Sequence, residues 1–228
     1  MKRLIGLVVV TLLLTAIGNH AQDMNHALLL KGIMSLPTGE FAETDYYKNS
    51  GFAKSGFGAS VEYESRFGTS PVKWFISSDI IINYFDEDLF GDMIYATTGL
   101  LPSIDNKPNI NIPTMIGAKF TGELTSSIEF QIFGGFGLNV SLPPNYEMII
   151  TNIQNSGKGW SDNELATSFG YKIGGALFIN KIILQVYYLD LGEPSYKGFF
   201  HFPSGARNNA DFKQPISMML FSVGVNVF

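Results

Sequence analysis

The sequence contains no cysteine, and only 15% of its 228 residues are charged. The absence of cysteine excludes a disulfide-stapled scaffold, and the charged fraction lies well below the ~25% of an ordinary soluble domain. Outside the first twenty residues, no apolar run approaches the ~18 residues of a membrane-spanning helix. A disordered chain has low hydrophobicity, whereas 46% of the residues here are hydrophobic, so disorder is excluded as well. These absences leave a folded chain with much apolar surface and few charges to solvate it.

The amino terminus has the pattern of a secretory signal peptide. Two basic residues precede the apolar stretch Leu4–Ile17, and small or polar residues follow it. We expect cleavage after Ala21, with cleavage after Gly18 as the alternative. The stretch is short for a permanent membrane anchor, and no cysteine follows it that could carry a lipid. The sequence therefore predicts a signal peptide at residues 1–21 and one mature domain at residues 22–228.

The mature chain is acidic. Cleavage removes Lys2 and Arg3 but no acidic residue, so the formal net charge falls from −5 to −7. No basic patch remains that could attract a phosphate backbone. Nucleic acid is therefore excluded as a partner.

Apolar and polar residues alternate with a period of two along most of the mature chain, as in half-buried β-strands. In Ile128–Val140, for example, Phe130 and Ile132 share one face while Glu129 and Gln131 share the other. Eight such segments are predicted, at residues 28–36, 56–64, 74–84, 110–120, 128–140, 168–177, 182–188 and 217–228. Most have about 9–13 residues, which is close to the 9–11 that cross a bilayer. A strand in a globular protein averages only about 5–6.

The connections between these segments alternate in length. Three are short: residues 68–73 and 121–127, and the two-residue hairpin Asn180-Lys181. Four are long and rich in Gly, Pro, Asn and Asp, at residues 37–55, 86–109, 141–164 and 192–215. Short turns at one end and long loops at the other are typical of outer-membrane barrels. The predicted fold is all-β, an eight-stranded antiparallel up-and-down transmembrane β-barrel, with both termini and the short turns in the periplasm.

Alternation alone does not say which face is outside, since a soluble lipocalin-like barrel has an apolar lumen instead. A water-facing exterior would be rich in Lys and Glu, whereas the polar face here is mostly Gly, Ser and Asn with few charges. Lipid is therefore expected outside. The few charges then lie in a closed lumen, where they must pair. The predicted network balances Lys31, Arg66, Lys119 and Lys172 against Glu62, Glu64, Asp79 and Glu129.

Several segments carry a family resemblance: Leu36–Phe41, Gly56–Tyr63, Ile112-Pro113 and the terminal Phe228. They are similar to the small outer-membrane β-barrel proteins of Gram-negative bacteria, more narrowly the porin-family or PorT-like group with an outer membrane protein beta-barrel domain. The resemblance implies a place in the cell outer membrane, among lipid and lipopolysaccharide, after insertion by the barrel-assembly machinery. It carries no common activity.

Phe228 departs from the pattern of that group. A terminal Phe usually continues an apolar every-second-residue series, whereas Phe228 is in phase with Asn226, Gly224 and Ser222. A β-bulge would restore the phase. Otherwise Phe228 caps the floor of the lumen.

Few residues of the mature chain point to catalysis. The mature chain has two histidines, His26 and His201, at expected opposite ends of the barrel, and there is no G-x-S-x-G elbow. No His or Cys pair has the spacing of metal ligands. We therefore expect no enzyme activity and no cofactor.

Two features of the long loops remain. Asp86, Glu87, Asp88 and Asp92 could hold a divalent cation, although a solvated acidic loop is the favoured interpretation and no metal site is predicted. Tyr196, Phe199, Phe200, His201 and Phe202 cluster in the last loop. They could anchor a surface ligand, although packing on the barrel rim or in lipid is favoured.

The predicted role is structural or surface-interacting, through the four long extracellular loops and an unknown surface ligand. A narrow channel for ions or very small solutes is the first alternative. A lipid-modifying enzyme and a secretion-system component are weaker ones.

Overall fold

The structure, a computed structural model, describes residues 26–45, 50–68, 70–98, 102–150, 157–202, 204–209 and 211–227. The predicted signal peptide and the orientation of Phe228 lie outside these residues.

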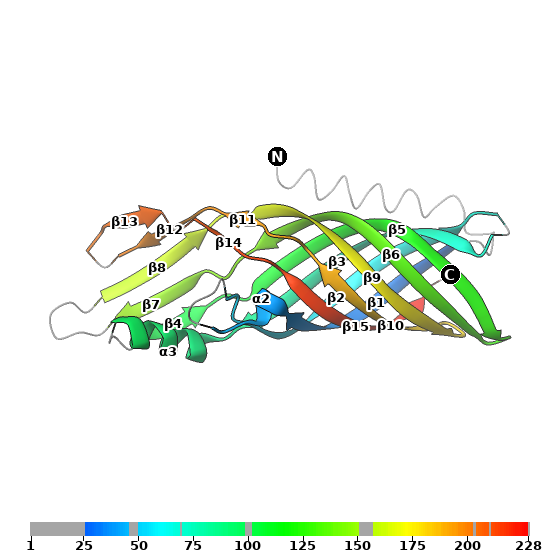
Figure 1. Cartoon of the computed structure of the whole chain (residues 1–228), viewed down its shortest axis with the longest axis horizontal. Helices are drawn as coiled ribbons and strands as arrows, with labels where there is room; N and C mark the ends of the chain where they lie inside the picture. The colour runs from blue at the N-terminus through cyan, green and yellow to red at the C-terminus, as the bar shows by residue number, and fades with distance from the viewer. Residues whose placement is uncertain are drawn as a thin grey trace.

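Eight long strands close into one barrel (Figure 1). They are β1 (His26–Thr38), β2 (Ala53–Arg66), β3 (Val72–Phe85), β5 (Asn109–Thr125), β6 (Ile128–Leu142), β9 (Ala166–Ile179), β10 (Ile182–Asp190) and β15 (Ser217–Asn226). Each pairs antiparallel with the next along the chain, and β15 pairs with β1 to complete the cylinder. The prediction of an eight-stranded antiparallel up-and-down barrel is confirmed, and most of the strands run a few residues beyond the predicted segments.

The short connections have the backbone that tight turns need. In the hairpin between β9 and β10, Ile179 pairs with Ile182 across Asn180 and Lys181. Asn180 has a φ of 58°, in the left-handed region that asparagine tolerates better than most residues. Its position fixes the register of two strands, so that both isoleucines share a face.

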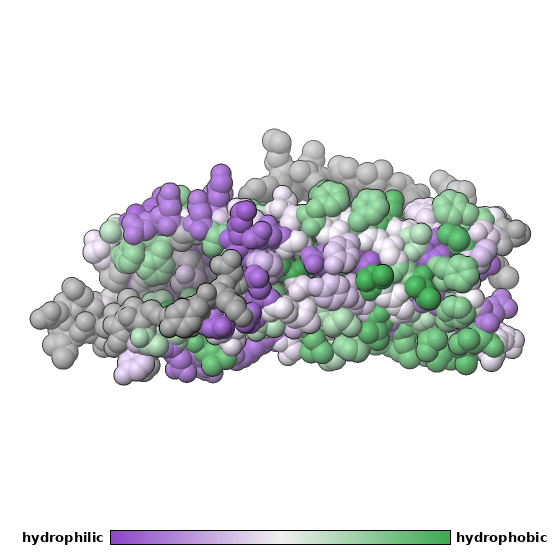
Figure 2. Space-filling model, viewed as in Figure 1, coloured by the Kyte–Doolittle hydropathy of each residue, from purple (hydrophilic) through white to green (hydrophobic). Residues whose placement is uncertain are grey.

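The two faces of the barrel wall differ sharply in exposure. Large apolar side chains cover the outside, among them Phe136, which is 58% exposed. Charged side chains such as Lys31, Glu62 and Lys119 are buried inside. Figure 2 shows hydrophobic residues over the barrel and hydrophilic ones at the end that carries the long connections. The barrel is thus inverted relative to a water-soluble one.

The inward face is more apolar than the sequence suggested. Beside the small and polar residues, it carries a hydrophobic core of large side chains, including Leu29, Ile33, Phe75, Ile81, Met115, Phe133, Ile183, Leu189, Met218 and Leu220. An eight-stranded barrel leaves room only for side chains, so these residues fill the space between polar layers.

The long connections are not simple loops, which corrects their sequence-based description. They contain helices α2 (Gly39–Ala42) and α3 (Glu87–Thr98) and strands β4 (Pro102–Asn106), β7 (Tyr146–Ile150), β8 (Gly157–Asn163), β11 (Ser195–Tyr196), β12 (Gly198–His201), β13 (Arg207–Asn209) and β14 (Phe212–Lys213). Five of these strands form a sheet in the order β13-β12-β8-β7-β4 that continues beyond the barrel wall (Figure 1). No helix among the described residues has the length and apolarity needed to span a membrane.

Inward glycines let neighbouring strands approach closely as the small barrel coils. A Cβ atom added to Gly137 of β6 would lie 1.9 Å from the carbonyl oxygen of Thr114 on β5. Backbone cannot move aside as a flexible side chain can. Gly134, three residues earlier on the same strand, has its nearest atom at 3.8 Å.

We predict that Gly137→Ala disrupts the β5–β6 pairing and destabilises the barrel, because overpacking costs about 1–3 kcal/mol or more. Heat-modifiable migration in gels measures the folded fraction as urea is raised. Gly134→Ala is the matched control and is expected to unfold at the wild-type urea concentration. Equal midpoints for the two variants would contradict the close-approach argument.

Candidate functional site

A buried charge cluster occupies the middle of the lumen, centred on Glu62 of β2. Its carboxylate is 1% exposed and lies 2.9 Å from Lys31 Nζ and 3.3 Å from Lys172 Nζ. Lys119 Nζ also donates to it. The three lysines come from β1, β5 and β9, so strands on different sides of the barrel meet at one carboxylate. Such short, desolvated ion pairs are the arrangement that buried charges require.

A second group of charges lies toward the short-turn end. Lys119 Nζ also reaches Glu64 at 2.9 Å, and Lys73 Nζ bridges Glu64 at 3.0 Å and Glu129 at 3.1 Å. Arg66 is 3.9 Å from Glu129 and is partly exposed. The charges therefore form one connected chain from the middle of the lumen to its short-turn mouth.

Seven of the eight residues predicted for the lumen network lie within 4 Å of an opposite charge; they are Lys31, Glu62, Glu64, Arg66, Lys119, Glu129 and Lys172. Asp79 differs. It accepts a hydrogen bond from Ser60, and no cation within the described residues pairs with it, so the predicted balance of four against four is not the arrangement found.

Lys73 also belongs to this chain of charges, although it is not in the predicted network. The sequence predicts it in the short turn at residues 68–73. Its phase gave the signal, because Lys73, Phe75 and Ser77 occupy alternate positions of one strand and point inward together.

An aromatic layer lies beside the central charges. Phe75 and Phe133 meet edge to face at 6.2 Å, and Phe133 meets Tyr187 in the same way at 5.9 Å. Lys172 Nζ is 4.5 Å from the Phe75 ring centroid and Lys119 Nζ is 5.3 Å from it. The ammonium groups thus gain cation–π contacts that are strongest away from water. Rings and ammonium groups therefore lie side by side at this level of the lumen.

A polar vestibule of about 540 Å³ opens at the short-turn end. Glu64, Arg66, Lys73 and Glu129 line it, together with Phe178 and residues of the short turns. Its inner end is the Lys73–Glu64 ion pair, where the charged chain begins.

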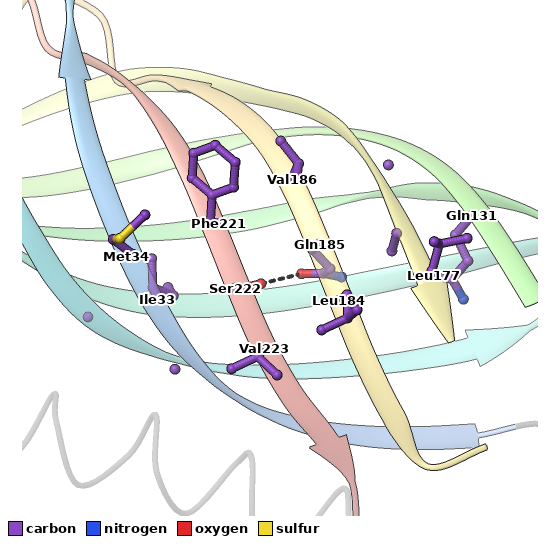
Figure 3. Close-up of a pocket in the computed structure, with 14 residues that line it drawn as sticks. Ile33, Met34, Gln131, Leu177, Leu184, Gln185, Val186, Phe221, Ser222 and Val223 are labelled. Atoms are coloured by element: carbon purple, nitrogen blue, oxygen red, sulfur yellow. Dashed lines mark hydrogen bonds between the residues drawn. The ribbon is translucent and has the colours of Figure 1, made fainter. Parts of the chain in front are cut away.

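A larger hollow of about 910 Å³ belongs to the outer wall and is mostly apolar (Figure 3). Gly32 lies in it between exposed side chains that include Met34 and Phe221. Ser222 Oγ donates to Gln185 Oε1 at 3.2 Å and joins β15 to β10 (Figure 3). Both of these polar residues are buried on the inward face, so the outer hollow presents hydrocarbon.

The five aromatic residues of the last long connection do not act together. Tyr196 is buried at the barrel rim, where its hydroxyl meets Ser141 Oγ at 2.6 Å, and burial raises the pKa of Tyr196 to about 12. Phe200 packs against Tyr146 and Phe202. Phe199 and His201 instead lie on the opposite face of β12.

His201 stacks on Trp160 of β8, with ring centroids 4.6 Å apart and an interplanar angle of 6°. Trp160 is not among the predicted site residues, because the sequence predicts a loop at residues 141–164. The alternation of Lys158, Trp160 and Asp162 on one face of β8 was the available signal.

The acidic residues after β3 begin a helix. The Asp86 carboxylate accepts the backbone N–H of Leu89 at 3.2 Å and pairs with Lys54 at 3.0 Å. Asp86 therefore caps α3, and Glu87 and Asp88 occupy its first turn, where acidic side chains are favourable. Within the described part of the chain, no three His, Cys, Asp or Glu residues form a group suited to a metal ion.

The two histidines of the mature chain lie far apart. His26 Nδ1 is 2.8 Å from the hydroxyl of Tyr63 at the short-turn end, whereas His201 lies on the distal sheet. They cannot contribute to one catalytic site. The distal sheet is the five-stranded sheet β13-β12-β8-β7-β4 beyond the barrel wall.

No protein-family model matches the sequence, and no curated protein matches it. Solved structures similar to the chain include the attachment invasion locus protein Ail of Yersinia pestis, at 12% identity and a TM-score of 0.45 over 90% of this chain and 99% of that one. Neisserial surface protein A is similar at 9% identity and a TM-score of 0.43, over 88% and 96% of the two chains. A major outer membrane protein from Thermus thermophilus shares 8% identity at a TM-score of 0.48, over 88% and 98%. These values are low, and the barrel assignment rests on this chain's own strand pairing.

We predict that Glu62→Gln strongly destabilises the folded barrel. Neutralising one carboxylate leaves three buried lysines short of their shared counter-charge, which is expected to cost about 3–5 kcal/mol. Urea unfolding of the refolded protein, followed by intrinsic fluorescence, measures the loss. Glu123→Gln, at an exposed acid near a short turn, is the control and should unfold as the wild type does. A Glu62→Gln midpoint equal to that of the control would contradict a central role for Glu62.

Proposed function

We propose that the protein is an integral protein of a bacterial outer membrane, with a closed, ion-paired lumen, that acts through the part of the chain outside the membrane. The observation that supports this most directly is the inverted barrel, because exposed apolar residues cover its wall while Glu62 and three lysines are buried inside. In water, such an exterior would be a large aggregation-prone patch. In lipid, the closed barrel satisfies every wall strand without an open edge.

Aromatic residues support a membrane position for the barrel. Tyr63 and Trp74 lie in contact on the outer wall toward the short-turn end, with ring centroids 5.5 Å apart. Phe57 and Tyr84 do the same toward the long-connection end, at 6.1 Å. Two aromatic girdles mark the two interfaces of a lipid-embedded barrel.

The short turns then lie in the periplasm and the distal sheet lies outside the cell. Outer-membrane lipid and lipopolysaccharide surround the barrel, and the barrel-assembly machinery inserts it. The PorT-like grouping remains part of this proposal.

The role is non-enzymatic, and the distal sheet supplies the specificity. Function in barrels of this kind lies in segments held by a rigid scaffold. Here the scaffold continues directly into a five-stranded sheet with its own ion pair and ring stacking. That construction favours a surface-interaction protein over a purely structural one.

A narrow channel is the second candidate, favoured by the polar vestibule of about 540 Å³ at the short-turn end. The vestibule ends at buried ion pairs, and the layer of Phe75, Phe133 and Tyr187 lies next to the central charges. For a solute to pass, this whole layer would have to move.

The topology is tested with an epitope inserted at two turns that have open space around them. Gly205, between β12 and β13, and Gly68, between β2 and β3, both have no other atom within 4 Å of an added Cβ. We predict that an epitope at Gly205 binds antibody on intact cells, whereas an epitope at Gly68 binds only after the outer membrane is permeabilised. The reverse result, or labelling of both on intact cells, would overturn the proposed orientation.

We predict no stable large conductance for the wild type in planar bilayers, because side chains fill the lumen. Phe75→Ala removes a ring from the aromatic layer and is expected to raise ion conductance measurably. Phe136→Ala, a change of the same size on the outer wall, should leave it at the wild-type level. Steady conductance by the wild type would instead establish the channel.

A further inference from the structure

The distal sheet has two faces of different character, and strand register assigns each residue to one of them. His201 pairs with Trp160, and Trp160 pairs with Glu147. Residues directly opposite each other in antiparallel strands point to the same side. One face carries Tyr146, Met148, Gly159, Ser161 and Phe200, and it packs against Phe90 of α3 through Tyr146. We call the other face the outer face; it carries Ser103, Asp105, Glu147, Ile149, Lys158, Trp160, Asp162, Phe199, His201, Arg207 and Asn209.

A stripe of ring and aliphatic side chains crosses the outer face through Phe199, His201, Trp160 and Ile149. Trp160 remains 42% exposed although His201 stacks on one side of its ring, and Ile149 is 49% exposed. The rings are held by the sheet and by each other, so little side-chain freedom is left to lose on binding. A rigid, exposed aromatic surface of this kind is a docking surface for an apolar ring face.

Charges flank the stripe, and of the two basic groups one is ion-paired and the other lies over a ring. Lys158 pairs with Glu147, and the Arg207 guanidinium lies over the Phe199 ring, 3.3 Å from its centroid. Asp105 and Asp162 are exposed, and within the described residues no ion pair or side-chain hydrogen bond engages either of them. The outer face therefore has an excess of negative charge and two carboxylates with open acceptor positions.

We propose that the outer face binds a neutral glycan from outside the cell, with a pyranose ring on Trp160 and its hydroxyls donating to Asp162. One face of a pyranose is lined by C–H groups that pack on an aromatic ring, while its rim carries hydroxyl donors. Trp160 and Asp162 are two residues apart on one strand, so they lie about 6.6–6.8 Å apart along β8. This spacing brings a carboxylate to the rim of a ring stacked on the indole. Hydrogen bonds to a charged acceptor are the stronger kind.

The same charges argue against an anionic saccharide. Sulfated or phosphorylated sugars, including the phosphorylated core of lipopolysaccharide, would meet a face on which Asp105, Glu147 and Asp162 outnumber the two basic groups, and Lys158 is already paired with Glu147. A neutral chain meets no such repulsion. The occupant is thus distinguished by charge from the saccharides nearest the membrane.

The test uses the full chain in phosphatidylcholine nanodiscs. The sequence has two tryptophans, so Trp74→Phe leaves Trp160 as the only fluorescent indole. The probes are dextran, mannan and soluble galactan as neutral glycans, and heparin and lipopolysaccharide as anionic ones. We expect at least one neutral glycan to bind saturably and to protect Trp160 from acrylamide quenching, while the anionic probes do not.

Variants locate the binding. In light-scattering or calorimetric titrations, Trp160→Ala and the isosteric Asp162→Asn should each weaken neutral-glycan binding about tenfold or more, since about 1.4 kcal/mol corresponds to a factor of ten. Tyr95→Ala, which removes an aromatic ring that is 53% exposed on α3, should bind as the wild type does. Heat-modifiable migration verifies that each variant is folded.

Binding that survives in both Trp160→Ala and Asp162→Asn, tighter binding of heparin or lipopolysaccharide, or no binding of any neutral glycan would overturn the inference. The inference rests on the proposed surface location, yet the two fail separately. Intact-cell labelling at Gly205 without glycan binding would refute only the glycan proposal, and loss of that labelling would refute the location itself.

Discussion

Eight strands closed on themselves enclose a space that only side chains can fill, and that constraint governs the rest of this structure. Every inward residue must either pack or be paired. The polar ones meet the demand through Glu62, where lysines from β1, β5 and β9 share a carboxylate that is nearly inaccessible to solvent. Close pairing offsets the desolvation penalty of buried ions. Removing any one partner therefore leaves an uncompensated buried charge, which destabilises the folded barrel. The apolar exterior is the counterpart of this arrangement. Most charged residues of the barrel strands face the lumen, so few remain on the outer wall to be solvated.

Much of the barrel could be predicted from the sequence, because the alternation of apolar and polar residues depends only on neighbouring residues within one strand. The strands, their order and the inward phase of Lys31, Glu62 and Lys119 all follow from alternation. Which charges meet does not, because partners depend on shear and on side-chain reach across the lumen. Lys73 lies one residue before the predicted strand at residues 74–84, so the predicted network omits it. That network includes Asp79 among the paired charges, whereas in the structure Asp79 accepts a hydrogen bond from Ser60. Large apolar residues such as Phe75 and Met115 also occupy inward positions. They make the inward face less polar, but the side chains of each strand still alternate between the two faces.

The distal sheet was beyond sequence reasoning for a different reason. Its strands span only three to seven residues, which is too short for alternation to stand out among turn-forming residues. Their pairing is non-local, since β12 meets β8 from a different connection. Trp160 and His201 therefore stack although the whole of β9 and β10 lies between them in the chain. The Asp86 cap is the opposite case, because an acidic residue before two more acids is a helix-start signature that was open to recognition.

The charge cluster also has a bearing on the path by which the barrel forms. Glu62 and its three partners are separated by 31, 57 and 110 residues, and Lys31 further donates to Gln185, whose neighbour Ser222 lies on the last strand. The first two strands bring Lys31 and Glu62 together directly, since β1 and β2 are neighbours in the barrel, whereas Lys119 and Lys172 reach Glu62 from β5 and β9. The last two strands of the barrel contribute neutral partners, because Gln185 of β10 accepts from Lys31 and from Ser222 of β15. Closure of the seam between β1 and β15 therefore adds the last hydrogen bonds around the cluster, which links the first strand of the chain to the last through Lys31, Gln185 and Ser222.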